Sequence, residues 1–162
     1  MKRVTTLLGA VAGLAIAGNA HAATATGNLN VSITITASCS VVSATNLDFG
    51  STSTIGANID QTSTLTVNCT NSTPYTVALS AGGGAGATVA SRKLTSGGNT
   101  LNYSLYRDAA RTQLWGVTTG TDTAAGTGTG ANQTMTIYGR VPSQASPVPG
   151  AYTDTVTVTI TY

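Results

Sequence analysis

The chain has 162 residues, of which only 7% are charged and 41% are hydrophobic. It contains no glutamate and only seven lysines and arginines, too few for the basic surface that nucleic-acid binding requires. Threonine, serine, glycine, alanine and valine dominate, whereas strong helix formers are scarce, and this composition favours β-strands over helices. We therefore expect an all-β protein that does not bind nucleic acid.

The first 22 residues have the pattern of a secretion signal. Lys2 and Arg3 precede an apolar run, and Asn19-Ala20-His21-Ala22 then supplies the small residues that signal peptidase reads. The run covers about 14 residues, fewer than the roughly 20 that a membrane-spanning helix needs. We expect cleavage between Ala22 and Ala23 and no membrane span in the mature chain. An uncleaved N-terminal anchor is the alternative.

Cleavage at this point would also change the charge of the chain. Removal of Lys2 and Arg3 leaves five basic residues against five aspartates, so the mature formal charge is zero. Two copies of a neutral protein repel each other weakly, which suits self-association.

In an exported chain, Cys39 and Cys69 predict a disulfide, worth about 3–4 kcal/mol for a loop of this length. Two free thiols are the alternative.

Alternation of apolar and polar residues predicts most of the strands. Residues 27–36 alternate without a break and predict a strand with one buried face, formed by Leu29, Val31, Ile33 and Ile35. Shorter alternating stretches predict strands at 65–69, 75–79, 101–106, 135–141 and 152–162. The glycine-rich stretches 82–86 and 118–131 predict loops. About seven strands separated by turn signals are typical of a β-sandwich.

The mature chain offers little for catalysis. Its single histidine, His21, lies in the expected signal peptide, so none is left for a catalytic triad or a metal site. The glycines of residues 126–130 resemble a phosphate-binding loop, but the Lys-Ser/Thr that should follow is missing. We interpret Arg92-Lys93 as a solvated turn, and the scattered aspartates as loop and turn residues. We expect no enzyme activity, no cofactor and no metal.

A set of short sequence blocks resembles one protein family across essentially the whole mature chain. Each block alone is weak, but the blocks occur in order and are specific as a set. They are Leu47-Asp48-Phe49-Gly50, Val67-Asn68-Cys69-Thr70, Pro74-Tyr75, residues 101–108, Trp115-Gly116, Tyr138-Gly139-Arg140-Val141 and residues 150–156. The set resembles the spore coat protein U family, which includes the major subunits of archaic (Csu-type) chaperone–usher pili.

The resemblance implies an incomplete immunoglobulin-like β-sandwich that lacks its last strand. A periplasmic chaperone would first fill the gap with a strand of its own, and the N-terminal strand of the next subunit would replace it at an outer-membrane usher. The resemblance also implies a disulfide between Cys39 and Cys69. The family's donor residues fall on Leu29, Val31, Ile33 and Ile35. The acceptor groove would contain three residues of the last strand, namely Val156, Val158 and Ile160.

The organisation that follows is a signal peptide (1–22), a donor-strand extension (23–37) and a pilin domain (38–162). We expect the protein to be the structural major subunit of a surface pilus. The pilus would be a homo-polymer of this subunit that also carries a tip subunit, and it would support adhesion and biofilm formation. Three alternatives stay open. The strand at 25–35 could open a complete sandwich, the chain could be a tip adhesin, or it could be a secreted coat or matrix protein that uses the same sandwich without a pilus.

Overall fold

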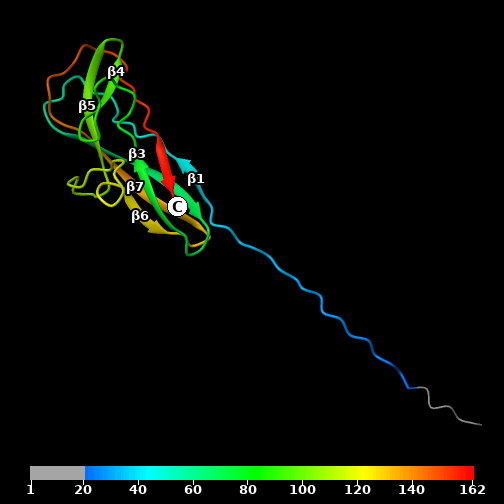
Figure 1. The fold of residues 1–162 in the computed structure, drawn as a ribbon. Helices are drawn as coiled ribbons and strands as arrows, with labels where there is room; N and C mark the ends of the chain where they lie inside the picture. Colours follow the sequence, from blue (N-terminus) through cyan, green and yellow to red (C-terminus); the bar gives the residue numbers. More distant parts are fainter. Residues whose placement is uncertain (1–20) are drawn as a thin grey trace, which may run out of the picture. The chain divides into compact units, whose positions relative to one another are not determined.

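The computed structural model describes residues 21–162, and this part of the chain is all-β, with eight strands and no helix (Figure 1). The chain divides into two units, one that ends at Thr34 and one that runs from Ile35 to Tyr162. All eight strands belong to the second unit, which we call the domain. The apolar run predicted as a secretion signal lies outside the described residues.

The domain consists of two antiparallel sheets. The larger sheet has the strand order β1-β2-β7-β5-β4, and the smaller sheet has the order β6-β3-β8. The longest pairing joins β2 to β7, from Ile59 opposite Val141 to Asn68 opposite Asn132. In chain order the strands are β1 (Cys39–Ala44), β2 (Ile59–Cys69), β3 (Pro74–Leu79), β4 (Arg92–Ser96), β5 (Asn99–Tyr106), β6 (Ala124–Thr127), β7 (Asn132–Val141) and β8 (Val158–Thr161). The architecture is an immunoglobulin-like β-sandwich that lacks its last strand.

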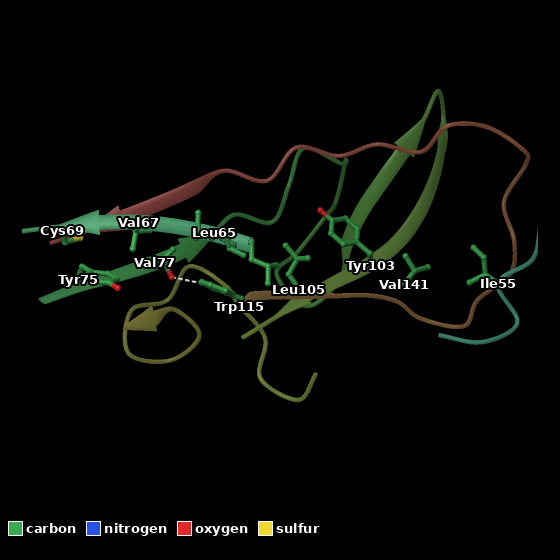
Figure 2. Close-up of a cluster of buried hydrophobic side chains, with 12 residues drawn as sticks. Ile55, Leu65, Val67, Cys69, Tyr75, Val77, Tyr103, Leu105, Trp115 and Val141 are labelled. Carbon is green, nitrogen blue, oxygen red and sulfur yellow. Dashed lines mark hydrogen bonds between the residues drawn. The ribbon is translucent and has the colours of Figure 1, made fainter. Parts of the chain in front are cut away.

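The core lies between the two sheets and follows the alternation in the sequence. β2 and β3 contribute every second residue to it: Leu65, Val67 and Cys69, and Tyr75, Val77 and Leu79. Trp115, which follows β5, is buried among them, and its indole N–H donates a 2.8 Å hydrogen bond to the carbonyl of Val77 (Figure 2). Because the polar atom of the indole is paired, the tryptophan can fill the core without leaving a buried donor unsatisfied.

Two interpretations of the sequence are wrong. Arg92-Lys93 is not a solvated turn, because it begins β4 and the Arg92 side chain is fully buried. Residues 118–131 are not entirely a loop, because β6 forms within them and pairs with β3. The ring of Tyr75 lies where a Cβ on Gly126 would be, so this glycine allows close packing of two strands and does not mark a turn.

Candidate functional site

On one side of the sandwich, each sheet ends in a strand with an unpaired edge. β1 ends the five-stranded sheet and β8 ends the three-stranded sheet, and no strand among residues 21–162 pairs with their outer edges. β1 and β8 contact each other across the gap between the sheets, where the cyan and red strands approach in Figure 1. An unpaired strand edge offers free N–H and C=O groups to a further strand.

An apolar groove continues from this gap. A first part, of about 220 Å³, begins between Ala44 at the end of β1 and Val158 at the start of β8. A second part, of about 780 Å³, is walled mainly by loops. The two parts share Leu47, Phe49 and Leu94 and therefore form one depression, which we call the lateral groove. Its other apolar side chains include Leu79, Leu105, Ile137, Leu101 and Val141.

The three residues predicted to line an acceptor groove lie on one face of the last segment. Val156 and Val158 line the lateral groove. Ile160 lies two residues further along, opposite Val77 of β3, and packs against the core. The threonines between and beyond them are exposed. Regular pairing is shorter than the strand predicted at 152–162, because β8 pairs with β3 only from Val158 to Thr161.

The Asp154 carboxylate lies among the apolar side chains of the first part of the lateral groove. Asp154 accepts a 2.6 Å hydrogen bond from the hydroxyl of Tyr103, and its other oxygen accepts from the backbone N–H groups of Gly83 and Thr155. Gly82, at φ +85°, permits this approach because a Cβ there would overlap the carboxylate. Burial raises the pKa of Tyr103, and the hydrogen bond to Asp154 raises it further, so the hydroxyl keeps its proton.

Near this pair, the buried guanidinium of Arg92 holds together the end of β3 and two loops. It donates to the backbone carbonyls of Ser80 (2.8 Å), Val89 (3.0 Å), Leu79 (3.0 Å) and Trp115 (2.6 Å). Burial lowers the pKa of Arg92, and a nearby phenol and two carboxylates act in the opposite direction. An arginine stays charged under such conditions. These four hydrogen bonds thus fix the backbone around Leu79, which lines the lateral groove.

β1 is fastened at one end and irregular in its middle. A disulfide joins Cys39 to Cys69 of β2. Between Val41 and Ser43 the pairing with β2 slips by one residue, and Val41 and Val42 are 42% and 49% exposed. A β-bulge of this kind bends and twists an edge strand. The exposed valines therefore lie on the open edge of the five-stranded sheet.

The unit that precedes the domain carries most of the predicted donor residues. Leu29, Val31, Ile33 and Ile35 are 74–86% exposed. Residues 21–38 form neither helix nor strand, so the strand predicted at 27–36 is not formed in the single chain, because a strand requires a ladder of hydrogen bonds to a partner. Contiguous exposed apolar residues in a soluble protein usually mark an interaction site.

Among residues 21–162, charged side chains form ion pairs on one sheet but no candidate metal site. Residues 21–162 contain no cluster of three or more His, Cys, Asp or Glu side chains that could hold a metal ion. In the same residues no helix is long and apolar enough to cross a membrane. On the outer face of the larger sheet, Asp60 of β2 forms ion pairs with Arg140 (2.7 Å) and Arg111 (3.4 Å).

Sequence reasoning missed several residues of the lateral groove. Leu47, Phe49 and the Tyr103–Asp154 pair were not singled out as groove residues. All four lie in the sequence blocks that carry the family resemblance, and this is the signal that could have found them. Periodicity could not, because Tyr103 and Asp154 are 51 residues apart in the chain.

Comparison with solved structures defines the class of this fold. The chain matches one from the crystal structure of the CsuC-CsuE chaperone–tip adhesion subunit pre-assembly complex, from archaic chaperone-usher Csu pili of Acinetobacter baumannii. The TM-score is 0.54 at 20% sequence identity, over 80% of this chain and 40% of that chain. At this identity the match concerns the fold, and the chain spans two fifths of the length of the one it matches.

Sequence comparison defines the family. The model of the Spore Coat Protein U domain matches residues 25–159, and the chain belongs to that family. Protein U of Myxococcus xanthus is 33% identical over 177 aligned positions, which cover all of this chain and 98% of that protein.

Proposed function

We propose that this protein is a structural subunit of a chaperone–usher pilus and polymerises by donor-strand exchange. One observation carries the proposal. The same chain has an apolar groove between two unpaired strand edges, and an exposed segment whose large apolar side chains recur at every second position. Leu29, Val31, Ile33 and Ile35 of one subunit would enter the groove of the next, with Val156, Val158 and Ile160 as part of its wall.

The expected strength of such a link suits a fibre. Burial of four large apolar side chains, at about 1.5–3 kcal/mol each, contributes roughly 6–12 kcal/mol as an upper bound. Main-chain hydrogen bonds to the edges of β1 and β8 would add to this. A link of this strength dissociates very slowly.

The remaining parts of the proposal concern export and assembly. Cleavage between Ala22 and Ala23 would release the mature chain into the periplasm. A chaperone would hold the groove there, an outer-membrane usher would catalyse the exchange, and the homo-polymer, with its tip subunit, would reach the cell surface. Its role would be structural, in adhesion and biofilm formation, and not enzymatic.

Deletion of residues 23–35 tests the proposal. The truncated chain and the full-length chain are each co-expressed with a candidate chaperone, and complexes and polymers are measured by co-purification and size-exclusion chromatography. The truncated chain should still bind the chaperone, since the groove lies in the domain, but should form no polymer. If truncation destroys the fold itself, residues 23–35 belong to their own domain and the proposal fails.

A secreted coat or matrix protein is the second candidate. It is favoured by the relative that matches over nearly its full length, Protein U, and by the spore coat proteins after which the family is named. Electron microscopy of cells that express the chain with its chaperone and usher distinguishes the two. Thin fibres support the pilus subunit, whereas a surface layer without fibres supports the coat protein.

A further inference from the structure

Once the chaperone has left, two N-terminal segments could fill the lateral groove: that of the same chain and that of a second copy. We infer that the short connection between Ile35 and Cys39 prevents the chain from filling its own groove with its apolar face, so the occupant is a second copy. The inference rests on the proposed function. It concerns how the chain keeps its polymerising segment available.

Fewer residues are free to form the connection than the sequence suggests, because Ser38, which precedes β1, is already held by Thr70, which follows β2. Its N–H donates to Oγ1 of Thr70 (3.1 Å), and its carbonyl accepts from the N–H of Thr70 (2.9 Å). The next residue, Cys39, is bound to Cys69 by the disulfide. Ser38 does not have a positive φ. Without loss of these contacts, Thr36 and Ala37 alone are left to form a turn.

Turns with an even number of residues present the wrong face. In an antiparallel pair, opposite residues point to the same side, and a shift of one residue moves every side chain to the other side. Cys39 packs against the core and Ser38 is exposed. A two-residue turn at 36–37 would place Ile35 opposite Ser38, away from the core. Turns at 37–38 or 35–38 have the same result, and the groove would receive Asn28, Asn30, Ser32 and Thr34.

Turns with an odd number of residues present the correct face but require an unsuitable backbone. A three-residue turn at 36–38 would place Ile35 opposite Cys39, but such hairpins typically end in a left-handed residue, usually glycine. Here that position is Ser38, which is held by Thr70. In a turn at 35–37, Ala37 would have to adopt the left-handed conformation, and Ile35 would lie in the turn and not in the groove. A five-residue turn at 34–38 also withdraws Ile35 and breaks the contacts of Ser38.

This constraint matters because a strand tethered to a groove normally enters it much faster than a strand from another molecule does. A segment on a short flexible linker has an effective concentration in the millimolar range, far above that of neighbouring subunits in a cell. If the connection were flexible and just long enough to form the required turn, each chain would capture its own strand before meeting another. The brevity of residues 36–38 and the anchoring of Ser38 therefore favour the polymer over the closed monomer.

Lengthening the connection tests the inference. An insert of about eight glycine and serine residues between Ala37 and Ser38 is compared with the same insert between Ala23 and Thr24, which lengthens the chain but not the connection. Both proteins are produced with their chaperone, and mass is measured by light scattering after size-exclusion chromatography. We expect the first insert to give folded monomers and to reduce polymer at least about tenfold, and the control to polymerise like the parent.

A second variant shows where the strand lies in those monomers. Val31→Asp, added to the insertion at residue 37, should lower the melting temperature of the monomer, because it would place a carboxylate in the groove. Polymerisation of the insertion protein at the rate of the control overturns the inference, as does a monomer whose melting temperature Val31→Asp leaves unchanged. Failure of the parent chain to polymerise would overturn the proposed function instead.

Discussion

The buried guanidinium of Arg92 satisfies four backbone carbonyls at once. Arg92→Met would keep much of the volume but leave those carbonyls without donors, and we expect a loss of about 3–5 kcal/mol in the free energy of unfolding. Urea unfolding can be followed by the fluorescence of Trp115, the single tryptophan. The neighbouring Lys93→Met, which removes one contact with a carbonyl, should cost less than about 1 kcal/mol. Equal losses would contradict the role given to Arg92.

Asp60 should make the free energy of unfolding of the domain depend weakly on pH. Hydrogen bonds from Arg140 hold the pKa of Asp60 below its usual value, partial burial opposes them, and the charges of Arg111 and Arg140 add to the lowering. A folded-state pKa below the unfolded value contributes stability above about pH 4, which is lost as the pH falls through the lowered folded-state pKa. Asp60→Asn should therefore cost at most about 1 kcal/mol at pH 7, since the pair is partly exposed.

The same difference should shrink toward zero at low pH. Urea unfolding of the parent and Asp60→Asn at pH 7 and at about pH 3 measures it. A difference that is the same at both pH values would show that the asparagine disturbs packing and that charge is not the cause.

At the scale of elements, β1 is joined to β2 by a covalent link as well as by its ladder of hydrogen bonds. The Cys39–Cys69 bridge spans a sequence separation of 30 residues, and loss of such a loop constraint costs about 3–4 kcal/mol. We expect this loss in the urea unfolding of the Cys39→Ala/Cys69→Ala variant. A reductant should destabilise the parent to the same extent and leave the variant unchanged. A loss below about 1 kcal/mol would mean that the ladder with β2 suffices to hold β1.

Strands with an apolar face could be predicted from the sequence, and strands fixed by tertiary contacts could not. β2 and β7 alternate clearly because one face of each packs on the core. β6 consists of Ala, Gly and Thr, and close packing of Gly126 on Tyr75 fixes it. β4 begins with two basic residues, which normally indicate solvent, and the burial of Arg92 depends on carbonyls of distant segments. Short polar strands thus carry little local signal.

The candidate site was predictable to a similar extent. Alternation indicates that Val156, Val158 and Ile160 share a face, and the family resemblance alone suggested that this face lines a groove. The position of Asp154 on the same face was equally readable. Its pairing with Tyr103 and the backbone of Gly83 was not, because it depends on how β5 and a glycine-rich loop meet the last segment.

At the scale of the whole molecule, the chain has two incomplete parts, which the proposed function pairs between copies. The domain has a groove without a strand, and residues 25–35 form an alternating segment without a ladder. Unpaired strand edges and exposed apolar side chains both favour association. The low charge of the chain, in which 7% of the residues are charged, leaves little repulsion to oppose it.

The alternation of residues 29–35 gives this proposed pairing between copies its sharpest test. Ile33 should enter the groove and Thr34 should point away from it, so the same substitution at the two sites should have opposite consequences. Ile33→Asp would bury an unpaired carboxylate, at a cost of several kcal/mol, and should accelerate dissociation of the polymer at least about 100-fold. Thr34→Asp should change it less than about threefold.

Survival of polymers in mild denaturant, followed over time by gel electrophoresis without boiling, measures both rates. Chaperone binding serves as the control, because the groove of each variant is intact and both should bind like the parent. Equal acceleration by the two substitutions would mean that the segment joins subunits without entering a groove. A larger effect of Thr34→Asp would mean that the polar face is the buried one, and the register assigned to residues 29–35 would be wrong by one residue.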